Sequence, residues 1–408
     1  MLKLSRIAFK NIFRNNRRTL ITFSVIIFGS TALLVAGGFI RYMFDGLARM
    51  TIRGGLGHLQ IVNPDQLRKD EEKPLQFGLE NPDKIAGIVS GVEGVEGATA
   101  RIDFMGLLSN GDKSVIFLGT GLEPEKEKAL GYETELLSGS SMTSDAGRYQ
   151  VMLATGLAKS LKSKVGDTLT LMSTTTEGAL NAIDVEVTAI FSTGITEYDE
   201  RALRVPLWVS KKLLDTDKVS KIVVGLAQTG QTDTLHDLLV TRLGSAGFPL
   251  EIRRWYEMAT FYQSVVRMFN TVFRMLGTII FVLVVLSSSN TMLMAVLERV
   301  REIGTLMAFG TTRFKVLAIF VFEGVLMGIL GGALGGVCGY MAIRGLNRAH
   351  LIMPTPPGNT HGFLIVIPMI PGIFAGVFLL MVATMALASL LPAFRASRLK
   401  IVDALNHI

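Results

Sequence analysis

The segment Glu298-Arg-Val-Arg-Glu-Ile-Gly-Thr-Leu-Met-Ala-Phe-Gly310 decides the fold, because it is a short charged stretch enclosed by long apolar ones. Residues 275–297 precede it, and residues 316–343 and 363–391 follow it. Each apolar segment exceeds the roughly 20 residues that a helix needs to cross about 30 Å of hydrocarbon. A soluble helix of that length would carry a polar face. The pattern therefore predicts three membrane-spanning helices.

The composition agrees with a membrane protein. The chain has 408 residues, of which 49% are hydrophobic and 18% charged, and its net charge is +7. Because the basic residues gather beside the apolar segments, as the positive-inside rule describes, the charge indicates a membrane rather than a nucleic acid as partner. The single cysteine, Cys338, lies in an apolar segment, which excludes an intramolecular disulfide and a cysteine metal cluster.

The N-terminal residues 1–18 are basic and contain no acid. Their apolar residues recur at helical spacing, which predicts an amphipathic helix on the cytoplasmic membrane surface; the alternative is a plain cluster of topogenic charge. Residues 19–40 are apolar or small and show no clear cleavage site. We therefore expect an uncleaved first spanning helix with its N-terminus in the cytoplasm.

Residues 45–268 contain no spanning segment and are numerous enough to fold as one or two domains. With a cytoplasmic N-terminus, one crossing places this block outside. Both ends of the block alternate between strand and helix patterns, whereas residues 110–217 look β-rich. The expected fold is thus a membrane protein with four transmembrane helices and a large α+β extracytoplasmic domain, in which a β-rich lobe is inserted into a split, porter-like α+β lobe.

The four spans predict the remaining topology. Residues 298–315 form a cytoplasmic loop, residues 344–362 a short outer loop, and residues 392–408 a cytoplasmic tail. Basic residues in the cytoplasmic loop and in the tail support this orientation.

The sequence contains no known catalytic motif. It lacks a phosphate-binding loop, a His-Glu-x-x-His pair and a Gly-x-Ser-x-Gly turn, and its five histidines show no ligand spacing. We therefore expect no catalytic residue, no metal site and no cofactor in this chain.

The segment 298–310 is the first candidate interaction site. A short amphipathic helix between two spans suits docking into the groove of a soluble partner; the alternative is a membrane-surface helix without a partner. Its apolar residues are expected to share one face, flanked by charges, and Gly310 to end it. The residues are Glu298, Arg299, Arg301, Glu302, Ile303, Leu306, Met307 and Gly310.

The third span carries two further features. Two staggered Gly-x-x-x-Gly rows predict close approach of another helix, from this chain or from a second one. The rows are Gly328, Gly332 and Gly336, and Gly331, Gly335 and Gly339. Glu323 is an acid inside the span, which indicates either a functional group or a carboxylate that pairs with an interfacial arginine or reaches the interface.

The first span predicts a cargo cleft. Gly37 and Gly38 are poor helix formers and leave space at the depth of the outer leaflet. An acyl chain could lie there, or the glycines could only serve helix packing. The cleft residues are expected to be Gly37, Gly38, Phe39, Met43, Phe269 and Phe273.

These motifs resemble a known family. Glu298-Arg-x-Arg-Glu-Ile-Gly-x-Leu-x-Ala-Phe-Gly310 is similar to the loop between the second and third spans of FtsX-like ABC transporter permeases. Phe322-Glu323-Gly324 with the glycine rows resembles their third span, and Leu391-Pro392-Ala393 their C-terminal end. Residues 156–169 and 190–199 resemble the periplasmic domain of the lipoprotein-releasing and macrolide-exporter branch.

The resemblance implies a permease of the bacterial inner membrane with both termini in the cytoplasm and the large domain in the periplasm. It implies a dimer with a second permease chain, the same or homologous, on two copies of a separate ATPase subunit that binds ATP and Mg²⁺. In that family the helix at 298–310 is the coupling helix, and mechanotransmission carries ATP-driven closure to the outer domain.

Three functions are compatible with the resemblance. The first is extraction or release of lipoprotein or lipid from the outer leaflet, which the absence of a fused ATPase favours. The second is efflux of a small amphiphile or peptide, and the third is mechanical signalling to a cell-wall hydrolase, which the size of the outer domain disfavours. A periplasmic chaperone or adaptor is a further candidate partner, and no nucleic acid is expected.

Overall fold

The computed structural model describes residues 16–68, 75–132, 135–145, 147–193, 196–353 and 363–398. These residues form two compact units, a helical unit of residues 16–45, 264–353 and 363–398 and an α+β unit of residues 46–263. The amphipathic helix predicted at 1–18 lies outside the described residues as far as residue 15. The same holds for the predicted tail beyond residue 398.

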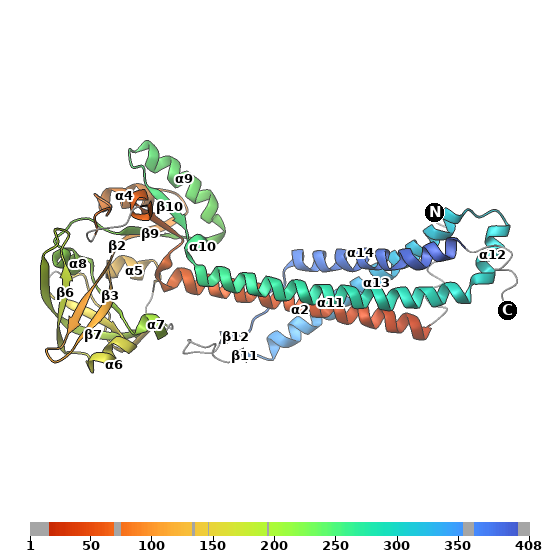
Figure 1. The fold of residues 1–408 in the computed structure, drawn as a ribbon, viewed down its shortest axis with the longest axis horizontal. Helices are drawn as coiled ribbons and strands as arrows, with labels where there is room; N and C mark the ends of the chain where they lie inside the picture. Colours follow the sequence, from red (N-terminus) through yellow and green to blue (C-terminus); the bar gives the residue numbers. More distant parts are fainter. Residues whose placement is uncertain are drawn as a thin grey trace. The chain divides into compact units, whose positions relative to one another are not determined.

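Four helices in the described residues are long and apolar enough to cross a membrane, which confirms the predicted class (Figure 1). They are α2 (Asn16–Thr51), α11 (Thr260–Glu298), α13 (Arg313–Arg348) and α14 (Pro371–Ser397). The first two extend well beyond the predicted spans at 19–40 and 275–297. Hydropathy marks only the stretch that suits lipid, whereas the backbone hydrogen bonds of a helix continue through amphipathic flanks.

The fourth span was predicted to begin too early, at residue 363. Phe363–Leu364 instead form a short strand, β12, antiparallel to β11 (Ile352–Met353). The segment after it is held extended by Asn347 at the end of α13, whose side chain donates to the Ile367 carbonyl (3.0 Å) and accepts its N–H (2.8 Å). The helix begins only at Pro371, because proline suits the first helical turn. An apolar run alone does not distinguish these conformations.

Both glycine rows of α13 pack against helices of the same chain. A methyl group on Gly331, Gly335 or Gly339 would meet side chains of α2, at 2.8 Å from Ile26, 1.7 Å from Ser30 and 2.5 Å from Leu34. Gly328 and Gly332 similarly face α14. Gly336 is the exception, since open space surrounds it. The rows therefore bring three helices of this chain into close contact.

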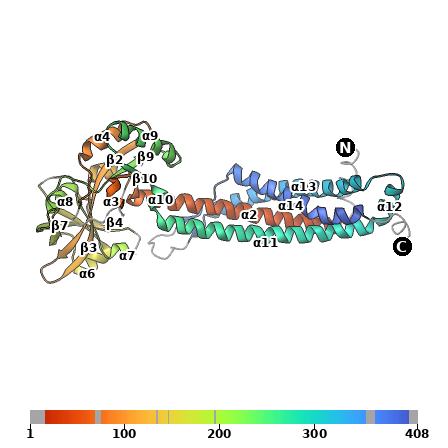
Figure 2. The same cartoon turned by 45° about the horizontal axis from the view of Figure 1, so that its top comes forward.

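Helices α2 and α11 run side by side in both views (Figures 1 and 2). The Thr22 hydroxyl donates to the Thr291 hydroxyl (3.0 Å), and the rings of Phe44 and Phe269 meet edge to face at 6.4 Å. Buried Ile26, Val284 and Met385 belong to the apolar core that these helices share with α14.

The described part of the α+β unit contains one ten-stranded sheet in the order β10-β1-β9-β2-β3-β8-β5-β7-β4, with β6 pairing to β2 and β7. The strands are β1 (Leu59–Val62), β2 (Val95–Ser109), β3 (Ser114–Leu122), β4 (Glu135–Gly139), β5 (Gln150–Ala154), β6 (Thr168–Thr174), β7 (Leu180–Ser192), β8 (Ala202–Pro206), β9 (Lys221–Leu226) and β10 (Glu251–Arg254). The β-rich segment 110–217 is thus not a separate sheet. The long strand β2 pairs with β9 near its start and with β3 and β6 near its end, so it joins both parts.

Short helices flank this sheet and cover its apolar core (Figures 1 and 2). They are η1 (Ile52–Leu56), α3 (Pro64–Arg68), α4 (Pro82–Ser90), α5 (Pro124–Ala129), α6 (Thr155–Leu161), α7 (Thr196–Asp199), α8 (Leu207–Leu214), η2 (Thr229–Gln231), α9 (Thr232–Ser245) and α10 (Trp255–Met258). The apolar residues Ile85 of α4 and Leu239 of α9 are buried in the core with Ile102 of β2. One further short helix, α12 (Val300–Ala308), belongs to the helical unit.

Candidate functional site

Helix α12 joins α11 to α13 (Figure 1). One of its faces is buried in the helical unit. The buried residues are Val300, Ile303, Gly304 and Met307. Ile303 and Met307 pack with Val296 of α11, Phe320 of α13 and Ala393 of α14. The spacing of the buried residues, i, i+3, i+4 and i+7, is that of one helical face. This face belongs to the core of the chain itself.

The opposite face of α12 is exposed. Glu302, Thr305, Leu306 and Phe309 occupy it with the same helical spacing, and Leu306 and Phe309 are 47% and 87% exposed. The expectation that Ile303, Leu306 and Met307 share one face is therefore wrong. Apolar residues lie on both sides of this helix, so the sequence pattern alone does not show which side is buried. The tertiary contacts show which side is exposed. Gly310, with φ at 89°, follows the helix.

Phe309 is a residue that the sequence reasoning missed. Phe309 follows Leu306 by three residues, so both lie on the helical face opposite the buried residues of α12. This spacing was the signal that the sequence offered. Glu298 and Arg301 are also exposed near this face. We call Arg301, Thr305, Leu306 and Phe309 the free face of α12, which the acids Glu298 and Glu302 border.

The side chains of Arg299 and Glu323 are buried and contact each other inside the helical unit. Arg299 is the residue that precedes α12, and its Nη1 lies 3.9 Å from Oε2 of Glu323 in α13. Their side chains are only 10% and 5% exposed. The intramembrane acid is thus paired with an interfacial arginine, and Arg299 is not available to a docking partner, contrary to the sequence prediction.

The cleft predicted at Gly37 and Gly38 is filled by the chain itself. A methyl group on Gly38 would lie 2.6 Å from Ile367, and one on Gly37 would lie 3.2 Å from Ile373 and 3.5 Å from Phe273. Both glycines are buried. They therefore act here as packing residues, which was the alternative interpretation.

The other predicted cleft residues lie on α2 and α11. Phe39 and Met43 are half-buried on α2. Phe269 packs against Phe44, and Phe273 against the apolar core of the helical unit. The structure thus brings Gly37 and Phe273 together as a packing contact.

An exposed apolar patch lies on the α+β unit, where β2 and β3 pair. Met105 is opposite Leu118, and Leu107 is opposite Ile116. All four side chains are exposed. We call these four residues the hairpin patch. The sequence signal was present in β2, where apolar residues occupy both alternating faces, as Phe104 with Met105 and Leu107 with Leu108 show.

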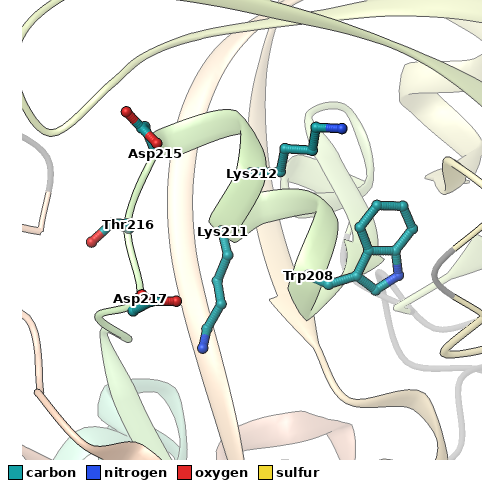
Figure 3. Close-up of a pocket in the computed structure, with 6 residues that line it drawn as sticks. All are labelled: Trp208, Lys211, Lys212, Asp215, Thr216 and Asp217. Atoms are coloured by element: carbon teal, nitrogen blue, oxygen red, sulfur yellow. The ribbon is translucent and has the colours of Figure 1, made fainter.

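A hollow of about 460 Å³ lies beside α8, and Figure 3 shows the residues that line it. Two lysines, two aspartates, Thr216 and Trp208 line it: Lys211, Lys212, Asp215 and Asp217 are the charged members. Its opposite charges balance, and it contains no arrangement of nucleophile and base. Among the described residues no group of His, Cys, Asp or Glu is placed to hold a metal ion.

Comparisons with known proteins match two families, one in each part of the chain. Residues 274–401 match the FtsX-like permease C-terminal family, and residues 19–241 match the MacB-like periplasmic core domain family. The chain is 23% identical over 336 residues to the lipoprotein-releasing system transmembrane protein LolC of Neisseria meningitidis serogroup B, covering 79% of this chain and 76% of LolC.

Two further similarities involve macrolide exporters. The chain is 27% identical over 353 residues to the macrolide export ATP-binding/permease protein MacB of Sodalis glossinidius, covering 78% of this chain and 49% of MacB. Among solved structures, the periplasmic region of MacB from Actinobacillus actinomycetemcomitans is similar with a TM-score of 0.37 and 17% identity, over 52% of this chain and 95% of that chain.

Four apolar helices joined to a mixed α/β domain, in the order that both family matches follow, define a membrane permease of the FtsX-like class. The chain belongs to the MacB-like periplasmic core domain family and is an ABC transporter permease of the LolC and MacB type. This confirms the resemblance inferred from the motifs. Both matched families describe transporter parts, and neither is an enzyme family.

Proposed function

We propose that the free face of α12 docks a separate ATPase subunit, and that the chain uses ATP hydrolysis to extract or release lipoprotein or lipid from the outer leaflet of the bacterial inner membrane. The observation that carries the docking proposal is the exposure of Leu306 and Phe309 on a helix whose other face is packed. ATP and Mg²⁺ would be held by the ATPase, present in two copies on a permease dimer.

The charges on and beside the free face favour a protein partner over a lipid surface. Glu298 and Glu302 accompany Arg301, so two acids stand against one base. A helix that binds an anionic leaflet carries mostly Lys and Arg on its polar side. Two exposed apolar side chains flanked by charges of both signs suit a groove in a soluble protein. Burial of each side chain there would contribute about 1.5–3 kcal/mol to the binding free energy.

The orientation follows from the positive-inside rule. Arg299, Arg301, Arg313 and Lys315 gather around α12, which supports a cytoplasmic position for this helix. The α+β unit then lies in the periplasm. A reporter fused at Thr311 should therefore be protected in intact cells, and one fused at Ser141 should be accessible; the opposite labelling would refute the orientation.

The hairpin patch supports an apolar cargo. Exposed apolar patches on soluble domains commonly mark binding surfaces, and Met105, Leu107, Ile116 and Leu118 form one on two paired strands. An acyl chain or the lipidated end of a protein would cover such a surface. The alignments with the relatives named for lipoprotein release cover most of the length of those relatives. This favours lipoprotein or lipid as cargo over a small amphiphile.

Identification of co-purified cargo tests the proposal. The complete complex is purified with its ATPase, and bound molecules are identified by mass spectrometry. Acylated protein or phospholipid in stoichiometric amount is the expected result. A bound small amphiphile or peptide would instead favour efflux, which the similarity to MacB keeps as the second candidate function.

A further inference from the structure

A buried arginine joins three elements of the α+β unit. Arg101 of β2 donates from Nε to Oε1 of Glu127 in α5 (2.8 Å) and from Nη2 to Oε2 (2.6 Å). Its third nitrogen, Nη1, donates to the carbonyl of Gly55 in η1. Both charged side chains are less than 10% exposed. The guanidinium therefore holds a strand, a helix and the end of another helix together.

The element that Arg101 holds directly follows the first spanning helix. η1 begins at Ile52, where α2 ends at Thr51. Gly55 has a φ of 117°, which ends the helical path. Carbonyls at the C-terminus of a helix lack helical partners and carry partial negative charge, so a cation is a suitable cap for them.

The backbone segment that connects α2 to the sheet is flexible. The connection Ile52-Arg-Gly54-Gly55-Leu-Gly57 contains three glycines, and β1 begins two residues later at Leu59. Glycine gives a backbone more conformational freedom than any other residue. Movement of α2 would therefore be absorbed by this connection if no other contact bridged it. Arg101 provides one such bridge, beside the packing of Ile52 against Trp255.

Strand β2 leads from the bridge to the hairpin patch. Met105 and Leu107 follow Arg101 by four and six residues on the same face of β2, about 20 Å along the strand at its farthest. Arg101 pairs with Lys221 of β9 and Leu122 of β3, so the strand is hydrogen-bonded on both sides at this point. A strand paired on both sides is stiff, whereas the glycine connection is not.

We propose that Arg101 is a positioning residue that locks the end of the first spanning helix onto β2, so that displacement of this helix moves the hairpin patch. The proposal rests on the proposed function, which gives that patch its contact with cargo. The ion pair with Glu127 holds the guanidinium in place, and the bond to Gly55 transmits the movement.

The test uses the full complex with its ATPase in lipid membranes. In a Cys338→Ser background, spin labels are placed at exposed Met50 and Ser114, and the distance between them is measured with and without ATP. We expect a narrow distribution in both states, because the clamp is rigid. In Arg101→Gln the distribution should broaden, and cargo release should fall about tenfold while the ATPase rate stays within about twofold.

Two matched variants separate transmission from folding. Thr99→Val removes the 3.2 Å hydrogen bond of Thr99 to Glu127 but leaves the bond to Gly55 intact, so it should behave as the unmodified chain does. Arg101→Lys keeps the charge beside Glu127 but loses the planar fork that reaches both partners. Arg101→Lys should fold, which tryptophan fluorescence would show, and should still broaden the distance distribution. If Arg101→Gln fails to fold, this variant decides whether Arg101 positions the helix end.

A gain of function completes the design. Space around Gly54 is open, and its φ is ordinary, so Gly54→Ala can stiffen the connection without a clash. In the Arg101→Gln background it should narrow the distribution again and recover part of the release. A narrow distribution and full coupling in both Arg101 variants would overturn the proposal. Absence of lipid or lipoprotein release by the unmodified complex would refute the proposed cargo instead, and the spin-label distances would still decide the role of Arg101.

Discussion

The guanidinium of Arg299 lies 3.9 Å from the carboxylate of Glu323, and both groups are buried in the helical unit. The pair connects the start of α12 to the third spanning helix. Because a charge inside an apolar core is costly without a partner, the pairing favours the burial of both groups. We therefore expect a displacement of α12 by a docked partner to be felt at α13.

Separation of this pair should destabilise the helical unit. Arg299→Leu and Glu323→Leu each remove one partner of this buried pair, with an expected cost of about 3–5 kcal/mol, whereas the double variant should lie close to the unmodified chain. Thermal unfolding in detergent, followed by far-ultraviolet circular dichroism, measures the three variants. Additive losses in the double variant would show that the two charges are energetically independent.

Changes on the free face of α12 should weaken ATPase docking without affecting the fold. Phe309→Ala removes an apolar side chain that a groove would bury, and Leu306→Asp introduces a carboxylate there; each should weaken binding about 10- to 100-fold. Binding of the ATPase to the permease in nanodiscs provides the measurement. Phe261→Ala is the control, since Phe261 is 70% exposed but lies outside α12. Unchanged binding by both variants would remove the coupling role from this face.

Two neighbouring glycines of α13 should respond in opposite ways to alanine. The methyl group of Gly335→Ala would lie 1.7 Å from the Ser30 hydroxyl, whereas that of Gly336→Ala meets open space. We expect a loss of about 1–3 kcal/mol from overpacking in the first variant and a gain of up to about 1 kcal/mol from helix propensity in the second. Thermal stability in detergent compares them. Equal stability would mean that α2 does not approach α13 at Gly335.

A charge on the hairpin patch should impair cargo release. Ile116→Asp places a carboxylate among Met105, Leu107 and Leu118, which disfavours contact with an acyl chain. Release in a reconstituted system should fall about tenfold or more, while ATPase docking stays unchanged. Leu238→Asp on α9 is the control, because Leu238 is also an exposed apolar residue of the same unit. If both variants release cargo normally, the patch is not a cargo contact.

The stability of the α+β unit should fall in mild acid because of His58. The Nδ1 of His58 accepts the Leu226 N–H (3.1 Å), and burial lowers the pKa of His58 to about 4 from its ordinary value of 6.5. The unfolded chain therefore binds more protons between these values, and stability is lost as the pH falls from about 6.5 towards about 4, by about 1–3 kcal/mol.

The two tryptophans, Trp208 and Trp255, both belong to this unit, so urea unfolding followed by their fluorescence measures its stability. In His58→Gln the difference between pH 7 and pH 5 should be smaller. The same difference in the variant and in the unmodified chain would assign the pH dependence to other groups.

Local composition determined several features of this protein. Four apolar segments predicted four spanning helices, because the cost of burying backbone in lipid depends on each segment alone. The motif 298–310 indicated a permease through its resemblance to FtsX-like permeases. Alternation of strand and helix patterns between the first two spans predicted a mixed domain.

The tertiary structure decided which surfaces are free. Leu306 and Met307 are adjacent and both apolar, yet one is exposed and the other is packed against α11, α13 and α14. Gly335 and Gly336 are adjacent as well, and only one of them contacts α2. Arg101 and Gly55 are separated by 46 positions, and nothing in the residues between them indicates their hydrogen bond. Hydropathy and propensity are properties of short stretches, whereas burial, pairing and exposure depend on contacts between residues far apart in the chain.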